Sequence, residues 1–259
     1  MDNIKNEMVA HPYKVAQNMK RYVRDILLQV HQTPTLEKML DLTNPIDYTV
    51  IYNLDDDKKL KAIADLREKI ASLEKKNHLS AEEKGLSNAK IELLEYRPNE
   101  DIQCIIMVEE LLRYSDENLL GIGIEQDSEL PHIYDGTYWS PIAKSLLREF
   151  LAEMATKTGE NYYNMRLNKN IDKLYNQFVS LCTLAPNLNE NKEEVKINLQ
   201  NGTFVISKEK KELRDFDKKD FFKYQLPFKY NPEAKCDEFK VFLNQVLPEK
   251  ESQMILAEY

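Results

Sequence analysis

The sequence is poor in glycine and cysteine, and both shortages narrow the possible folds. Six glycines and ten prolines in 259 residues argue against a loop-rich or all-β architecture. The three cysteines, Cys104, Cys182 and Cys236, are odd in number and widely spaced. Disulfide frameworks and zinc clusters both need closely spaced, paired sulfurs. We therefore expect reduced thiols and a cytoplasmic protein.

Long apolar runs are also missing. No stretch of 18 apolar residues occurs, so we expect no membrane span. The first residues, Met1-Asp2-Asn3-Ile4, have neither the basic start nor the apolar centre of a signal peptide. Both observations predict a protein that works without a membrane.

The sequence lacks the motifs of most enzyme classes. It contains no G-x-x-x-x-G-K-[ST] loop, so we do not expect this polypeptide to hydrolyse ATP. The pair Gly121 and Gly123 has no third glycine and lies in a strand-like run, which argues against a phosphate loop. The four histidines show no metal-ligand spacing and no nucleophile motif. We predict no catalytic residue and no metal site in this chain.

Positive charge is in the minority, with a formal net charge of −8. Affinity for DNA comes mainly from cations that neutralise phosphates, so DNA contact would need a local basic face. Lys218 and Lys219 are surrounded by acids, a pattern typical of a solvated face, with a phosphate contact as the alternative. The best candidate face is formed by Lys144, Arg148, Arg166, Lys169 and Lys173.

The first part of the chain, residues 1–98, reads as helical. Apolar residues recur at helical spacing over residues 11–31 and again over 36–42. Within 57–96, apolar residues step by three, four and three positions before a polar interruption at residues 77–78. We therefore predict an exposed helical hairpin over about 57–96.

From residue 99 to 259 the pattern changes to mixed helix and strand. We expect helices over 102–112, 141–154, 171–181 and 236–246, and a strand over 119–124. Asp135-Gly136 and Asn201-Gly202 each lie between strand-like segments, and these dipeptides favour tight hairpin turns. The predicted fold is α+β and mainly helical, with a compact second domain that carries two short β-hairpins.

Several residues of this second domain have two interpretations. Trp139, the only tryptophan, either packs between hairpin and helix or stacks on a nucleobase. Asn198, Asn201 and Gly202 are expected to serve turn geometry. Tyr230 and Pro232 are expected to lock an extended segment against the last helix.

Two blocks of this domain resemble a known family. The first block, about 130–158, contains Asp135-Gly136-Thr137-Tyr138-Trp139 followed by a helix. The second, about 195–248, contains an Asn198-x-x-Asn201-Gly202 turn, a Leu226-Pro227 step and the string Tyr230-Asn231-Pro232-Glu233-Ala234-Lys235-Cys236. Both are similar to the domain that precedes the superfamily-3 helicase motor in D5/P4-type phage and plasmid primase-helicases. The residues that carry the family pattern are Asp135, Gly136, Asn198, Asn201, Gly202, Pro227, Tyr230 and Pro232.

The resemblance implies a non-catalytic part in DNA replication, in the cytoplasm of a bacterial host. A full-length relative would be an ATP-dependent DNA helicase, and ATP and magnesium would belong to its motor, which we expect to be missing from this chain. The implied partners are single-stranded or forked DNA, the rest of the helicase and sister subunits in a homo-oligomer. The candidate DNA contacts are Trp139, Lys144, Arg148, Arg166 and Lys169. The alternative is a free-standing adaptor or regulator that assembles through its helical hairpin without touching DNA.

Overall fold

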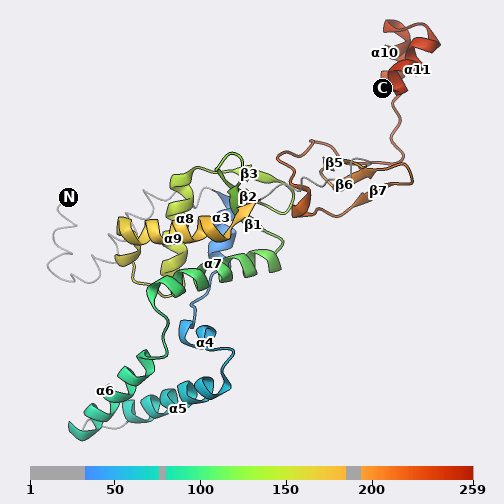
Figure 1. The fold of residues 1–259 in the computed structure, drawn as a ribbon. Coiled ribbons are helices and arrows are strands. Elements are labelled where there is room, and N and C mark those ends of the chain that lie inside the picture. The colour runs from blue at the N-terminus through green and yellow to red at the C-terminus, as the bar shows by residue number, and fades with distance from the viewer. Residues whose placement is uncertain (1–32, 76–79, 185–193, 259) are drawn as a thin grey trace, which may run out of the picture. The chain divides into compact units, whose positions relative to one another are not determined.

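The computed structural model describes residues 33–75, 80–184 and 194–258, and the predicted helix over 11–31 lies outside these ranges. The fold is α+β and mainly helical, as predicted (Figure 1). It divides into two compact units. Of the described residues, the first unit takes 33–75, 80–184 and Phe216–Tyr224, and the second takes 194–215 and 225–258. The domain boundary that we placed at residue 98 stays a prediction.

The predicted helical hairpin is present. Helices α5 (Asp57–Glu74) and α6 (Ser80–Leu94) lie side by side (Figure 1). Asp56 caps α5, because its Oδ1 accepts hydrogen bonds from the backbone N–H groups of Lys58 and Lys59, at 3.1 Å each. Ile63 and Ala89 are each 1% exposed, and they bury the narrow seam between the helices. Most other described positions of α5 and α6 face solvent. The hairpin is therefore exposed, as we predicted from its small number of apolar residues.

Helices and a small sheet build the core of the first unit. Helices α3, α7, α8 and α9 lie around the small sheet (Figure 1). Their buried faces form one apolar cluster with the inner strands. Among the side chains at its centre, Phe150, Leu151 and Phe178 are fully buried. The elements around this core are α3 (Pro34–Leu42), α4 (Tyr48–Tyr52), α7 (Glu100–Glu117), α8 (Lys144–Lys157), a short 3-10 turn η2 (Asn164–Arg166) and α9 (Asn168–Leu181).

The sheet of this unit has the strand order β3-β2-β1-β4. Strand β1 (Gly121–Glu125) pairs antiparallel with β2 (Pro131–Tyr134), and β2 pairs with β3 (Trp139–Pro141) through the predicted Asp135-Gly136 turn. Strand β4 (Thr183–Leu184), which the sequence did not reveal, pairs parallel with β1. The first predicted hairpin is therefore part of a four-stranded sheet.

The second unit contains the other predicted hairpin. Strands β5 (Val195–Leu199) and β6 (Gly202–Ile206) pair antiparallel around Asn201-Gly202, and β7 (Lys211–Arg214) adds a third strand. Gly202 has φ +142°, and a Cβ there would lie 2.5 Å from the carbonyl oxygen of Arg214. Glycine is therefore required both by the turn and by the adjacent strand. Helices α10 (Asp237–Val246) and α11 (Lys250–Glu258) follow.

The predicted position of Tyr230 against the last helix is wrong. Its ring stacks on Phe204 of β6 with a centroid separation of 4.4 Å. Its backbone N–H donates to Asn201 Oδ1 at 2.8 Å, and its carbonyl accepts from Asn201 Nδ2 at 3.0 Å. Helix α10 has no buried residue. The extended segment around Tyr230 therefore docks on the hairpin, because the amide of Asn201 offers a matching donor and acceptor at the turn.

Candidate nucleic-acid interface

Two cations of the predicted face, Lys144 and Arg148, lie beside the same tyrosine, and carboxylates pair with several members of that face. Arg148 on α8 donates to Asp172 Oδ1 on α9 at 2.5 Å. Lys144, at the first position of α8, places its Nζ 4.6 Å from the ring centre of Tyr175, which Arg148 also approaches at 5.9 Å. Tyr175 thus organises this pair of cations by cation–π contact. Only Lys144 of the two lacks a carboxylate partner in the described ranges.

Arg166 is held in place by a carboxylate and an aromatic ring. Its Nη2 donates to Glu153 at 2.9 Å, and its guanidinium lies 3.7 Å from the ring centre of Tyr162. The Glu153 side chain is only 5% exposed, so its charge needs this partner. Lys173 pairs with Asp101 at 2.8 Å. Lys169, by contrast, is exposed and has no ion pair within residues 33–75, 80–184 and 194–258.

Trp139 is buried, in line with the packing interpretation, and residues 216–224 supply part of its surroundings. Its ring is 3% exposed and lies against Tyr134 and Phe221, with ring centres 5.4 and 5.6 Å away. Its Nε1 donates to the carbonyl of Lys218 at 2.9 Å, and its backbone N–H donates to Phe222 at 2.7 Å. The ring is almost fully buried in this structure, so it exposes no face for stacking on a base.

The partner of Trp139 is a segment that we call the clasp, residues 216–224. The chain enters it after β7 and leaves it again for the second unit, yet the clasp itself packs in the first unit. Lys218 forms an ion pair with Asp116 of α7. Phe221 has φ +53°, the left-handed region that non-glycine residues seldom adopt, so surrounding contacts hold this backbone in place.

A buried charge cluster fixes the other end of the clasp. Lys223 Nζ lies 2.5 Å from Glu125 Oε1, and Ser128 Oγ donates to Glu125 Oε2 at 2.6 Å. These hydrogen bonds, the Lys223 bond first, hold the pKa of the buried Glu125 carboxyl below its usual value. His132 Nε2 is 3.8 Å from the same carboxylate. The clasp thus supplies the lysine that pairs with the buried Glu125.

Between the clasp, α7 and the β1–β4 edge lies a cavity of about 440 Å³, which we call the Trp139 cavity. Two glycines of β1 allow close packing here, Gly121 against the Trp139 ring and Gly123 against β4. A Cβ at Gly121 would lie 2.8 Å from the Trp139 ring, and a Cβ at Gly123 would lie 2.6 Å from the carbonyl oxygen of Cys182. The cavity is lined by Leu112, Ser115, Leu120, Gly121, Ile122, Trp139, Leu181, Cys182, Thr183, Leu184, Lys218, Lys219 and Phe221.

The family-pattern residues of the first block shape a turn. Asp135 Oδ1 accepts from the backbone N–H groups of Thr137 and Tyr138 at 2.8 and 3.1 Å, and from the Thr137 hydroxyl at 2.7 Å. Gly136 has φ +106°, which suits glycine. This turn sets the register that carries Trp139 to the clasp.

The family-pattern residues of the second block hold the chain against the end of the β5–β6 hairpin. The carbonyl of Asn198 accepts from Leu226 N–H at 2.9 Å, and Gln200 N–H donates to Phe228 at 3.0 Å. Pro227 and Pro232 are exposed in this stretch. Together with the Asn201–Tyr230 pair, these bonds make residues 225–230 a strap across the hairpin end.

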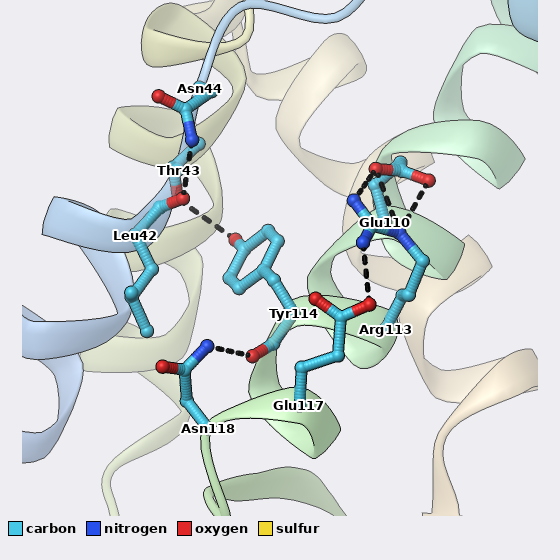
Figure 2. Close-up of polar contacts among 8 residues, drawn as sticks. All are labelled: Leu42, Thr43, Asn44, Glu110, Arg113, Tyr114, Glu117 and Asn118. Carbon is cyan, nitrogen blue, oxygen red and sulfur yellow. Dashed lines mark hydrogen bonds and ion pairs between the residues drawn. The ribbon is translucent and has the colours of Figure 1, made fainter.

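A second cavity of about 410 Å³ lies where the α3–α4 connection meets α7. Its polar groups satisfy one another. Figure 2 shows Arg113 held by Glu110 and Glu117, at 2.6 and 2.7 Å, while the hydroxyls of Thr43 and Tyr114 lie 2.8 Å apart. This network joins α3 to α7, and its charged groups leave no unpaired cation to attract a phosphate.

Comparison with known protein families shows to which family the chain belongs. Residues 113–248, which are 136 of the 259 residues, match the family model described as D5 N terminal like. The chain belongs to the D5 N-terminal-like family. This domain is found in phage and plasmid primase-helicases. A search of curated proteins finds no match. In the described residues, no helix is long and apolar enough to cross a membrane.

Sequence reasoning assigned Lys218 and Lys219 to a solvated face, and it singled out no role for Phe221. The structure places all three beside Trp139, in the lining of the same cavity. No local sequence pattern predicts this proximity, because about 80 residues separate Trp139 from the clasp. The family match does cover both segments, and it is the one signal that unites them.

Proposed function

We propose that this chain is a non-catalytic region of a phage- or plasmid-type DNA-replication helicase, where it contributes to DNA handling and subunit assembly. Membership of the D5 N-terminal-like family supports the setting. ATP and magnesium are assigned to the helicase motor, because the sequence has no phosphate-binding loop to hold a nucleoside triphosphate. The proposed location is the cytoplasm of a bacterial host.

The observation that carries the assembly role is the apolar face of α10, which lies within the family match up to residue 248. Phe239, Phe242 and Val246 recur at positions i, i+3 and i+7, and each is more than half exposed. Met254 and Ile255 of α11 are exposed to 60% or more. Burying one such side chain contributes about 1.5–3 kcal/mol, so an apolar surface of this kind favours association.

We assign the occupant of this face to a second copy of the chain. The C-terminal half of α10, from Val241 to Val246, carries no charged side chain, so two copies can approach there without like-charge repulsion. A linked pair of amphipathic helices from each copy would form a four-helix contact. Homo-oligomers with such self-complementary surfaces are the commonest protein assemblies.

Sedimentation velocity of the full chain tests this assembly. The double variant Phe239→Ser and Phe242→Ser should sediment as a monomer, whereas the parent chain should sediment as a larger species at micromolar concentration. Leu54→Ser is the matched control, since Leu54 is equally exposed but lies between α4 and α5. A parent chain that stays monomeric would remove the assembly role.

The DNA role is supported by Lys144 and Lys169, the two predicted contacts that have no carboxylate partner in the described residues. We expect labelled single-stranded and forked DNA to bind the full chain at low salt, with an affinity that falls as salt rises. Reversing both charges, with Lys144→Glu and Lys169→Glu, should lower the salt slope by about 1.4, or 0.7 for each lost phosphate contact on a single strand.

The control for this experiment reverses two exposed lysines of the helical hairpin, with Lys58→Glu and Lys61→Glu. It changes the net charge by the same amount. An equal loss of affinity in both double variants would mean that only overall charge matters, and the α8–α9 assignment would be wrong.

The second candidate is an adaptor that assembles without touching DNA. It is favoured by the net charge of −8 and by the carboxylate partners of Arg148 and Arg166. Stable self-association together with no DNA binding at low salt would support the adaptor and reject DNA handling.

A further inference from the structure

The Trp139 cavity has an apolar and aromatic lining of a size that suits a small organic ligand. Ligand sites commonly have volumes of about 300–1,000 Å³, and this cavity has about 440 Å³. Trp139 and Phe221 contribute aromatic surface, and Leu112 and Leu184 contribute aliphatic surface. A flat, weakly polar group fits such a lining better than a sugar or a small ion does.

All the charge in the lining is positive. Lys218 and Lys219 belong to the clasp, and none of the lining residues is acidic. Lys218 shares its charge with Asp116, which does not line the cavity, while the exposed Lys219 has no ion pair in the described ranges. The exposed lining residues Leu181, Thr183 and Lys219 mark the mouth, so an anionic group outside the mouth would meet Lys219.

Ser115 adds a polar group to the lining. It is 2% exposed, and its hydroxyl has no hydrogen-bond partner within the described residues. A buried hydroxyl without a partner is costly, so a ligand with a polar edge that reaches it gains a hydrogen bond at little further desolvation cost.

We infer that the Trp139 cavity receives one unstacked base of single-stranded DNA, with the adjoining phosphate at Lys219. A nucleotide combines the three properties that the lining selects: a flat aromatic body, a polar edge and an anion attached outside. The base contacts Phe221, which is half-buried, and the edge of Trp139 that reaches the lining. This inference rests on the proposed DNA-handling function and adds a location to it.

Trp139 gives a direct readout, because it is the only tryptophan of the chain. Its fluorescence, excited where tyrosine does not absorb, reports on this cavity alone. We expect short oligothymidylate to change the Trp139 fluorescence in a saturable manner, over the same concentration range as the anisotropy of a labelled strand. Thymidine 5′-monophosphate should produce the same spectral change with weaker affinity.

Two variants and one control locate the site. Lys219→Glu should weaken oligothymidylate binding about tenfold, the loss expected for one charge-assisted phosphate contact. Thr183→Phe places a ring at the exposed mouth, on a strand position that tolerates aromatic residues, and should abolish the fluorescence change. Lys61→Glu, on the helical hairpin, should leave both readouts unchanged.

The outcomes separate this inference from the proposed function. If the labelled strand binds but Trp139 fluorescence and the two cavity variants show no effect, the cavity is not the site, and DNA handling stands. If no strand binds at low salt, both fail. A response to the mononucleotide alone, or an equal response to an aliphatic carboxylate, would also overturn the inference.

Discussion

Replacing Gly123 by alanine tests how closely β1 and β4 pack. A Cβ at this position would lie 2.6 Å from both the carbonyl oxygen of Cys182 and Cγ of Leu184. The same carbonyl accepts the hydrogen bond from Ile124 N–H at 2.8 Å. The strand β4 must therefore move away, and the β1–β4 hydrogen bonds must lengthen or break.

The magnitude follows from three contributions. Overpacking a buried site costs about 1–3 kcal/mol, and a weakened backbone hydrogen bond costs about 1 kcal/mol. The stiffer unfolded chain of an alanine variant returns about 0.4–1 kcal/mol. We expect Gly123→Ala to lower the free energy of unfolding of the first unit by about 2 kcal/mol, the sum of these effects.

Urea unfolding followed by Trp139 fluorescence measures this change, since Trp139 lies in the same unit. Gly85→Ala is the matched control, because the nearest atom to its Cβ would be Leu73 Cδ1 at 3.9 Å, an ordinary contact. It lies in α6, where alanine should stabilise the helix by about 1 kcal/mol, read by circular dichroism. A Gly123→Ala chain as stable as its parent would refute the close-packing argument.

Three further predictions concern other parts of the chain. Tyr114→Phe removes the hydrogen bond to Thr43 and should cost about 1 kcal/mol in a urea titration. Burial raises the pKa of Tyr114 from 10.0 to about 12. The stability that the buried neutral phenol contributes is therefore complete below pH 10 and is lost as the pH rises from about 10 through about 12, a loss of about 2–3 kcal/mol. Alkaline melting of the parent chain should show this loss, and alkaline melting of Tyr114→Phe should lack it. Gly202→Ala should destabilise the β5–β6 hairpin by about 1–3 kcal/mol, seen as faster amide exchange in that hairpin alone. A thiol reagent should label the exposed Cys236 quickly in the native chain and the buried Cys182 slowly, because burial raises the pKa of Cys182 to about 12; equal rates would contradict the packing at the cavity.

The parts of the fold that the sequence predicted are those with local signals. Asp135-Gly136 and Asn201-Gly202 each fix a turn through the backbone of two residues, so both hairpins were correctly placed. The helical hairpin followed from the spacing of its few apolar residues. These features need no knowledge of distant segments.

The parts that were missed depend on distant segments. Strand β4 has two residues and exists because β1 offers it a parallel edge. Strand β7 is made of charged residues and leucine, a composition that is typical of a solvated face. The Trp139 environment needs the clasp, which is remote in sequence. The close packing at Gly123 likewise depends on Cys182, which is remote in sequence.

Placement also changed the weight of the predicted DNA contacts. By sequence, the four predicted cationic contacts were equivalent, but side-chain geometry pairs Arg148 and Arg166 with carboxylates and leaves Lys144 and Lys169 without such partners in the described residues. Charge alone cannot show this difference, because both helices carry acids as well as bases. The ion pairs of the folded chain determine which cations are left to bind a phosphate.

Fluorescence-detected sedimentation of a labelled forked DNA with the full chain tests the central claim most directly, because one boundary reports both DNA binding and the number of bound copies. At low salt, the account predicts that the DNA sediments with more than one copy of the chain, and that this complex dissociates as salt rises. DNA that sediments alone at low salt, beside a self-associated protein, would contradict it.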